Sequence, residues 1–273
     1  MENKEDTFSK FMKDVHWEVR ETRRYINQLK RYDFYKDYGN SILSKQYSFN
    51  ETIKIIRDKK MSFSRFGDGE FGLIFKNGFN LKFQPQSGKL IDSMREVLDT
   101  PLDNLLIGMP HLFDDERYFS VYSNYLPKML HMLEKHKHFG NSHVSRPVYF
   151  DLYQEEAVQS WRTLWDGMSV TFVTGKGSRF AYTPELFDNI KSYDFYETLP
   201  VDAFSEYDKI LSDLKENKSD LILISLGPTA TVLAYDLARM GKWAVDIGHI
   251  TNSFDNKIKG TGDWPESMKI KKD

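Results

Sequence analysis

The sequence predicts an α/β protein: a Rossmann-like, mostly parallel sheet flanked by helices, with an N-terminal helical extension. Three observations lead to this prediction. Short apolar segments alternate with amphipathic ones along most of the chain, as strands alternate with helices in such folds. Five of the predicted strands run directly into a turn that contains glycine. The clearest strand, residues 220–226, is apolar almost throughout, which is typical of a strand buried on both faces of a parallel sheet.

The composition fits one large α/β domain with a well-filled core. The chain has 273 residues, of which 40% are hydrophobic and 15% aromatic. Its 38 basic and 40 acidic residues give a net charge of −2, without the basic excess of a nucleic-acid-binding protein. There is no cysteine, which excludes disulfides and cysteine-based zinc sites and fits a reducing compartment. We therefore expect no nucleic-acid partner.

The chain shows no targeting or membrane-spanning pattern. Its first 14 residues, MENKEDTFSKFMKD, are polar and lack the apolar centre of a secretory signal. The longest apolar run, residues 221–226, is only as long as a strand. We expect a cytoplasmic protein without a transmembrane segment, and peripheral contact with a membrane stays open.

The first 46 residues are predicted to form a helical extension and a connector, and residues 47–273 a Rossmann-like domain. Apolar positions between residues 8 and 29 recur at alternating spacings of four and three, which draws one stripe along a helix: Phe8, Met12, Val15, Val19, Thr22, Ile26 and Leu29. Two interpretations stay open. The stripe is the seam of a homodimer, or it packs on its own domain.

In the first half of the domain, helices and strands are predicted from the periodicity of apolar residues and from the glycines and prolines that end them. We predict a helix at 51–59, a strand at 61–66, a tight turn at 67–70 followed by a helix through 71–75, a helix at 90–98, a strand at 104–107 and a mainly helical segment at 114–137. The helix at 90–98 should end before Thr100, because the residue before a proline disfavours helical backbone angles.

The second half repeats the alternation. We predict strands at 144–150, 169–173, within 193–200, at 220–226 and at 243–247, and helices at 155–165, 205–216 and 230–240. A group of histidines in an irregular polar segment is expected at the surface: His131, His136, His138 and His143. The tail from residue 256 onward is polar and predicted to be loosely held.

Five strand ends carry the functional argument together. Their turns are GDGE (67–70), GMPH (108–111), GKGS (175–178), LGPT (226–229) and DIGH (246–249). Because ligands of parallel sheets bind beyond the carboxyl ends of the strands, all five turns are predicted to face one crevice. Each turn alone is explained more simply as a tight turn. None of them is a Walker loop or a complete dinucleotide fingerprint.

The GDGE turn places two carboxylates, Asp68 and Glu70, at a strand-to-helix crossover that Gly67 and a second glycine are expected to loosen. Arg65 lies just before the turn. Paired carboxylate oxygens suit Mg²⁺ or Mn²⁺, and such a cation can hold a diphosphate. The simpler alternative is a helix whose first turn carries acidic residues that favour the helix dipole.

Three further turns offer groups for an anion. The GKGS turn and the arginine after it supply backbone N–H groups, the Ser178 hydroxyl and the cations Lys176 and Arg179. Gly227 opens a helix, whose N-terminus is a natural anion site. His249 ends the last strand, where it can act as a metal ligand, a phosphate contact or a proton acceptor.

The segments SRFGDGE, GKGSRF, SLGPTA and DIGHI, in this order, resemble the GT-D fold glycosyltransferases of bacteria, a family first catalogued as a domain of unknown function. The resemblance covers residues 47–250. It implies a nucleotide-sugar donor, with UDP as the expected nucleotide, and a divalent metal held by the Asp-x-Glu pair. Carried over to this sequence, Asp68 and Glu70 serve the metal and the diphosphate, and the residues expected near the donor are Arg65, Gly67, Lys176, Ser178, Arg179, Gly227 and Thr229.

What the resemblance implies is a metal-dependent hexosyltransferase that uses Mn²⁺ or Mg²⁺. The sugar would pass to a lipid-linked or protein-linked glycan acceptor in the synthesis of bacterial surface polysaccharide or glycoprotein. Asp68, Glu70 and His249 are the candidate catalytic residues. Metal and cationic side chains would neutralise the charge that builds on the leaving nucleoside diphosphate. Two alternatives stay open: a metal-dependent phosphohydrolase, and a non-catalytic nucleotide-binding partner of another transferase.

Overall fold

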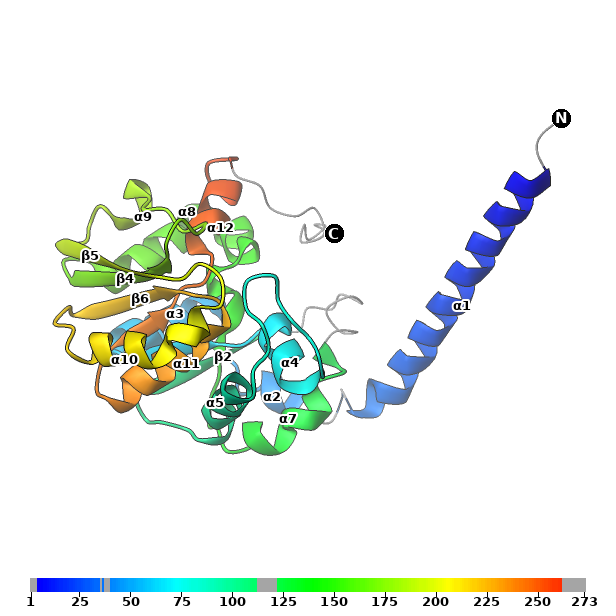
Figure 1. Cartoon of the computed structure of the whole chain (residues 1–273), viewed down its shortest axis with the longest axis horizontal. Helices are drawn as coiled ribbons and strands as arrows, with labels where there is room; N and C mark the ends of the chain where they lie inside the picture. The colour runs from blue at the N-terminus through cyan, green and yellow to red at the C-terminus, as the bar shows by residue number, and fades with distance from the viewer. Residues whose placement is uncertain (1–3, 35, 37–39, 112–121, 262–273) are drawn as a thin grey trace. The chain divides into compact units, whose positions relative to one another are not determined.

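The computed structural model describes residues 4–34, 36, 40–111 and 122–261 (Figure 1). The chain divides into two compact units. One comprises Met1–Ser44 and Leu112–Leu130, and the other Lys45–His111 and His131–Asp273. We describe each unit by itself.

The first unit is dominated by one long helix, α1 (Lys4–Phe34), which is 31 residues long and confirms the predicted N-terminal helix. A short helix, α2 (Asn40–Leu43), follows. Of the helical segment predicted at 114–137, the described part forms α7 (Leu126–Leu133), while residues 112–121 lie outside the described residues. Pro127 occupies the first turn of α7, where its missing N–H costs nothing.

The second unit is built on a seven-stranded, all-parallel sheet with the order β3-β2-β1-β7-β6-β4-β5, which confirms the predicted fold class. The strands are β1 (Ser62–Arg65), β2 (Leu105–Met109), β3 (Gly140–Asn141), β4 (Ser169–Gly175), β5 (Ser192–Thr198), β6 (Leu221–Ser225) and β7 (Ala244–Asp246). Val245 lies beside both Phe63 of β1 and Leu223 of β6. The last strand in the sequence, β7, therefore joins the two halves of the sheet.

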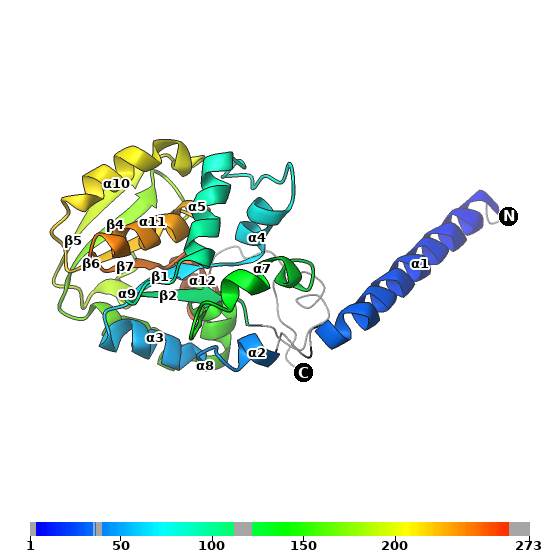
Figure 2. The same cartoon turned by 90° about the horizontal axis from the view of Figure 1, so that it is seen from below.

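Helices cover both faces of the sheet (Figure 2). On one face lie α5 (Gly88–Asp99), α10 (Tyr207–Lys215) and α11 (Pro228–Arg239), and on the other α3 (Phe49–Asp58) and α8 (Pro147–Trp165). Shorter elements complete the unit: α4 (Asp68–Phe75), α9 (Pro184–Phe187), α12 (Ile250–Lys257) and the 3-10 helices η2 (Ser142–Ser145) and η3 (Ala203–Glu206). Fully buried aromatic side chains fill the core, among them Phe63, Phe172, Trp161 and Trp165.

The strand predicted at 144–150 is wrong. These residues belong to η2 and to the start of α8, which opens with Pro147 in its first turn. The run Val148, Tyr149 and Phe150 is buried, so its apolar character reflects a helix start enclosed by other elements. A short apolar run does not distinguish a buried strand from a buried helical turn, whereas a proline favours the first turn of a helix.

The structure also contains α12, which the sequence analysis did not predict. This helix follows His249 directly, and Phe254 from it packs against Phe150 of α8, with ring centroids 6.3 Å apart. The polar tail begins inside this helix, at Asn256. Residues 262–273, the rest of that tail, lie outside the described residues.

Candidate functional site

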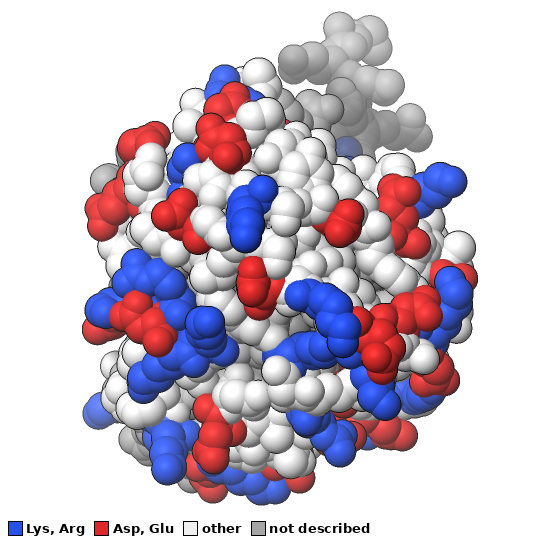
Figure 3. Space-filling model, turned by 90° about the vertical axis from the view of Figure 1, so that its left-hand side faces the viewer, with Lys and Arg blue, Asp and Glu red and all other residues white. Residues whose placement is uncertain are grey.

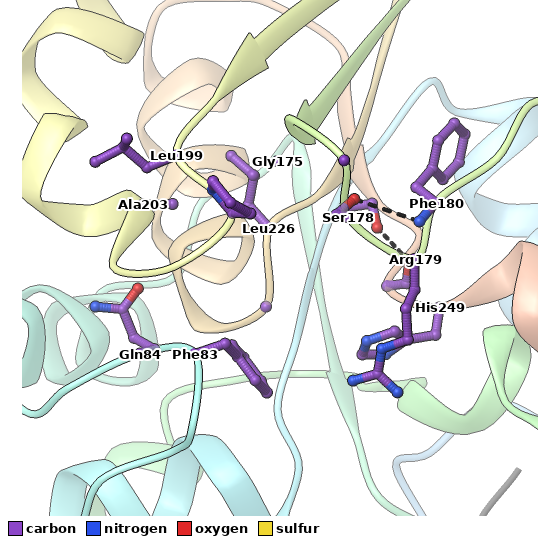
Figure 4. A pocket seen from close by; sticks show the side chains of 15 residues that line it. Phe83, Gln84, Gly175, Ser178, Arg179, Phe180, Leu199, Ala203, Leu226 and His249 are labelled. Atoms are coloured by element: carbon purple, nitrogen blue, oxygen red, sulfur yellow. Dashed lines mark hydrogen bonds between the residues drawn. The ribbon is translucent and has the colours of Figure 1, made fainter. Parts of the chain in front are cut away.

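A cavity of about 210 Å³ opens at the carboxyl ends of β4, β6 and β7 (Figure 4). Because these strands stand next to one another in the order β7-β6-β4, the turns that follow them meet there. Three of the five predicted turns supply the wall, together with two loops: Gly175, Gly177, Ser178, Arg179, Phe180, Ser225, Leu226, Gly227, Gly248, His249, Phe83, Gln84, Leu199, Pro200 and Ala203. The predicted crevice therefore exists over one half of the sheet.

The cavity has two chemically different sides. Leu199, Ala203 and Leu226 form an apolar side, and Arg179 and His249 lie next to each other on the opposite side (Figure 4). The Ser178 hydroxyl accepts the backbone N–H of Phe180 at 3.3 Å, which ties the turn after β4 to itself. An apolar wall facing a cationic one suits a ligand with a ring at one end and an anion at the other.

The loop after α4 also contributes to the cavity wall, through Phe83 and Gln84, and neither residue was among the predicted site residues. The Gln84 amide donates to Asp202 Oδ1 at 2.8 Å and accepts from the Thr229 hydroxyl at 3.1 Å. Gly227 has a φ of +55°, and a Cβ atom there would come within 2.6 Å of the Phe83 ring. No local sequence signal marks Gln84 and Phe83 as wall residues, because the side-chain contacts with Asp202, Thr229 and Gly227 come from segments more than a hundred residues away.

Four of the residues expected near the donor do not line the cavity: Arg65, Gly67, Lys176 and Thr229. Thr229 is fully buried behind the cavity wall, where its hydroxyl is bonded to Gln84. Lys176 is exposed and does not line the cavity, although its backbone N–H extends the β4–β5 ladder by donating to the Thr198 carbonyl at 2.8 Å. Ser178, Arg179 and Gly227 do line it.

The acidic turn lies at the end of β1, next to β7. Asp68 begins α4 and is exposed, while the Glu70 carboxylate accepts the backbone N–H of Gly67 at 2.9 Å. The expected backbone freedom is not used, since Gly67 has an extended φ of −147° and Gly69 lies within the helix. Lack of space explains Gly67 better, because a Cβ atom there would lie 3.2 Å from Glu70 Oε2.

Desolvation raises the pKa of Glu70 to about 7, the negative charges of Asp246 and Asp68 act in the same direction, and Arg65 opposes them. Within the described ranges, no group of three or more histidine, cysteine or acidic side chains gathers to hold a metal. Two carboxylates supply part of the oxygen shell of Mg²⁺ or Mn²⁺, whose other ligands are commonly substrate phosphates and water. The residues present fit a cation bound together with the donor.

Arg65, expected beside the carboxylate pair and near the donor, bonds to β7 and η2 and does not line the cavity. Its Nη2 donates to Asp246 Oδ1 at 3.0 Å, Nε to the Asp246 carbonyl at 3.0 Å, and Nη1 to the Ser142 carbonyl at 3.2 Å. The guanidinium thus ties β1, β7 and η2 together. It also lies against Gly248, whose φ is +47° and where a Cβ atom would overlap Arg65 Nη2 at 1.9 Å. The acidic turn and the DIGH turn are therefore held as one unit.

Histidines at this edge are neutral. Burial lowers the pKa of His249 to about 3, with further lowering by the charges of Arg146, Arg179 and Arg65. Burial likewise lowers the pKa of His143 to about 3, and its Nδ1 accepts the backbone N–H of His111 at 3.2 Å. The surface position expected for His143 is wrong, as it is for His136, whose ring bonds to the Leu98 carbonyl at 2.7 Å.

The remaining predicted turn, GMPH, follows β2 on the far side of β1 from β7. His111 contacts Gln46, with Nδ1 and Oε1 3.4 Å apart, and does not line the cavity. All five turns share the carboxyl edge of the sheet, but strand order assigns only three of them to the cavity.

Comparison with known proteins agrees with this geometry. The family model described as the glycosyltransferase GT-D fold matches residues 63–262, which include all five turns. The chain belongs to the GT-D glycosyltransferase family. The match begins within β1 and ends after α12, so it spans the sheet of this GT-D protein and leaves α1 outside.

Two curated relatives carry the same region within longer chains. Glycosyltransferase GlyD of Streptococcus pneumoniae serotype 4 (strain ATCC BAA-334 / TIGR4) is 28% identical over 219 residues, 76% of this chain and 27% of the relative. The probable glycosyl transferase Gly of Streptococcus gordonii is 30% identical over 222 residues, 76% of this chain and 32% of the relative. The GT-D protein thus spans about a third or less of the curated relatives it matches.

Solved structures share the fold. One, described as the highly conserved domain of unknown function 1792 with a distinct glycosyltransferase fold, is 30% identical, with a TM-score of 0.69 over 78% of this chain and 80% of that one. Another, a new glycosyltransferase (DUF1792) from Streptococcus sanguinis, is 29% identical, with a TM-score of 0.69 over 80% of this chain and 86% of that one. In the part of the GT-D protein that the structure describes, no helix is long and apolar enough to cross a membrane.

Proposed function

We propose that this GT-D protein is a metal-dependent hexosyltransferase that moves a sugar from a nucleotide-sugar donor, with UDP as the nucleotide, to a glycan acceptor. The observation that carries the proposal is the cavity beside the acidic turn. A half-apolar, half-cationic cavity lies at the carboxyl ends of β4, β6 and β7, and the neighbouring strand β1 carries the two carboxylates at its own carboxyl end. The family membership supports the same reaction class.

The two sides of the cavity match the two ends of a nucleoside diphosphate. Leu199, Leu226 and the Phe83 ring offer apolar surface for the base and ribose. Ser178 and Arg179 offer a hydroxyl and a planar cation for the diphosphate, and an arginine fork pairs well with phosphate oxygens. On this assignment the sugar points toward β7 and β1.

Asp68 and Glu70 would hold Mn²⁺ or Mg²⁺, which would act as a Lewis acid on the leaving diphosphate. Arg179 adds a fixed positive charge at the same place and lowers the barrier to departure electrostatically. His249 lines the cavity, and Gly248 before it lies against Arg65. Because its pKa is about 3, it is a poor proton acceptor, and a hydrogen-bond contact to phosphate or sugar fits it better than the role of general base.

The acceptor and its setting belong to the same proposal. We propose a lipid-linked or protein-linked glycan in the synthesis of bacterial surface polysaccharide or glycoprotein, made in the cytoplasm, with peripheral membrane contact. Both curated relatives are described as glycosyl transferases, the second as a probable one, which supports a sugar acceptor. The absence of cysteine fits a reducing compartment.

Incubating the protein with a panel of nucleotide sugars and Mn²⁺ tests the function against both alternatives. Transfer to added glycan with release of the nucleoside diphosphate supports a transferase. Rapid donor hydrolysis that no glycan changes would support a phosphohydrolase. Binding of the donor without turnover under every acceptor condition would support a non-catalytic partner of another enzyme. The same panel in excess chelator tests the metal.

We also propose that α1 joins two copies in a parallel coiled coil. With Met12, Val19 and Ile26 at the a positions, the d positions are Phe8, Val15, Thr22 and Leu29. β-Branched residues at a favour two-stranded coils. Glu18 then occupies a g position, and Arg23 the e position that faces it in a parallel partner. An antiparallel partner would lack this pair, so charge favours the parallel arrangement.

A further inference from the structure

The edge strand β5 presents aromatic rings on its surface. It pairs with β4 on one side only and ends the sheet. Tyr193 and Phe195, two residues apart on one face, are each 45% exposed. Phe180 and Tyr182, from the segment that follows β4, flank them and are half-buried. We call these four side chains the aromatic strip.

The strip is a built surface and not a scatter of exposed residues. Tyr182 stacks on Tyr193 with ring centroids 4.5 Å apart and an interplanar angle of 21°. Phe195 stacks on Phe172, its register partner in β4, at 5.3 Å and 25°. Phe172 itself is fully buried and also contacts Phe180 at 5.3 Å. This buried ring holds the exposed rings in fixed orientations.

The strip is continuous with the cavity. Phe180 belongs to both, since it lines the cavity and its ring contacts Phe195 at 6.4 Å. Leu199, which follows β5, is 42% exposed and also lines the cavity. A path of apolar surface therefore runs from the cavity out along β5. A ligand that extends beyond the cavity meets rings on this side.

Polar groups accompany the rings. Glu197 on β5 and Lys191 just before the strand are exposed, and each lies two residues from a ring of the strip, on the same face of the strand. Figure 3 shows the side of the molecule on which β5 lies in Figure 1, where uncharged surface is interspersed with charges of both signs. Flat rings with hydrogen-bonding groups beside them suit a molecule whose own rings have apolar faces and hydroxyl edges. A purely apolar partner would leave these charges unpaired.

We propose that the aromatic strip binds the glycan acceptor, several sugar rings long, with the reacting end at the cavity. This assignment rests on the proposed transferase function and adds the acceptor side to it. The rings supply apolar faces for sugar rings, and the neighbouring Glu197 carboxylate accepts hydrogen bonds from their hydroxyl groups. Since the strip reaches the cavity at Phe180, the acceptor would pass this ring and meet the donor sugar beside Arg179 and His249, on the side of the cavity that leads toward β7.

The test uses the full chain, a double variant and a glycan array. Tyr193→Leu with Phe195→Leu removes both flat rings but keeps apolar volume over Phe172. Met240→Ala is the matched control, since Met240 is an exposed apolar residue, 42% accessible, that follows α11 and precedes the central strand β7. Calorimetry with UDP and Mn²⁺ is run on every variant, because the donor site should not change. Thermal melting confirms that each variant folds, and Tyr193→Leu alone serves if the double variant does not.

The proposal expects the parent and Met240→Ala to bind the same oligosaccharides on the array. The double variant should bind them about tenfold more weakly, as the loss of two aromatic contacts predicts, with an unchanged Kd for UDP. Equal glycan binding by the double variant would overturn it, and so would a parent that binds UDP but no glycan. A change from dimer to monomer in the double variant would make β5 an interface between copies instead. If the parent fails to bind UDP, the proposed function itself has failed.

Discussion

Arg65 and Asp246 form a buried ion pair between the ends of β1 and β7, with Nη2 and Oδ1 3.0 Å apart and side-chain exposures of 13% and 2%. The same carboxylate oxygen accepts the backbone N–H of Gly248 at 2.9 Å. Two residues 181 positions apart thus fix the relation between the acidic turn and His249. The pair holds the two turns in position without lining the cavity, which explains why an arginine precedes the GDGE turn.

Breaking this pair should cost stability. Asp246→Ala leaves the Arg65 charge buried without its partner, which typically destabilises by about 3–5 kcal/mol. Asp208→Ala is the control, because its pair with Lys89 is exposed and such pairs are worth at most about 1 kcal/mol. Urea denaturation measures both changes. Equal losses in the two variants would contradict the structural role given to Arg65.

The metal assignment predicts loss of transfer in Asp68→Asn and Glu70→Gln, together with weaker Mn²⁺ binding in calorimetry. The melting temperature of Asp68→Asn should barely change, because its side chain is exposed. Glu70→Ala should in addition lose about 0.5–2 kcal/mol, since its carboxylate caps α4 at Gly67. Asp103→Asn, an exposed carboxylate before β2, is the control. Full activity of the Asp68 variant in excess chelator would refute the site.

Arg179→Ala should weaken UDP binding by about 1.5–3 kcal/mol, the usual range for a charge-assisted hydrogen bond. Arg179→Lys should restore only part of the loss, because lysine lacks the planar fork. Lys176→Ala is the matched control, as this cation from the same turn does not line the cavity. Calorimetry of all three with UDP decides the matter. If the two alanine variants bind UDP alike, the diphosphate lies elsewhere.

His249→Ala separates two roles. As a contact to phosphate or sugar, His249 should affect donor affinity and turnover together. As a general base it should affect turnover alone. The low pKa of His249 predicts the first outcome. It also predicts that titration of this residue does not change the activity near pH 6.5. A bell-shaped profile with a limb near pH 6.5 that disappears in His249→Ala would reverse the assignment.

Buried neutral His143 should make the fold sensitive to acid. Its pKa is about 3 in the folded protein and about 6.5 in the unfolded chain, so the unfolded state binds the extra proton between these values. Stability should therefore fall as pH drops below 6.5, by about 1.4 kcal/mol per pH unit from this group, or about 2 kcal/mol by pH 5. His143→Asn should lose correspondingly less stability from pH 7 to 5 in urea titrations. An identical loss in parent and variant would show that His143 is not the group responsible.

The parallel coiled coil of α1 predicts a dimer that depends on charge. Deleting residues 1–31 should give a monomer that still binds UDP. Glu18→Lys should weaken the dimer by facing Arg23 of the other copy with a like charge, and Glu18→Lys with Arg23→Glu should restore it. Light scattering measures the mass of each form. An unchanged mass after the deletion would mean that α1 packs within its own chain.

Local pattern sufficed for the parallel sheet. Each central strand is a short apolar run followed by a glycine turn and a helix. This alternation predicts parallel strands, and parallel strands carry the turns that follow them at the same edge of the sheet. The same locality explains the failures. The apolar run after Pro147 fits a strand or a buried helical turn equally well, and the packing of α8 distinguishes the two.

The sequence by itself determined the fold class, the N-terminal helix and the candidate residues at the strand ends. Tertiary structure decided which of them meet. Strand order brings Arg179, Gly227 and His249 to one cavity and places His111 at another part of the carboxyl edge. Thr229 is buried, and its hydroxyl bonds to Gln84. Arg65 pairs with Asp246 because β1 and β7 are neighbours in the sheet, although the two strands are the first and the last in the sequence. Residue type and spacing record what a side chain can do, whereas burial and partners from distant segments fix what it does.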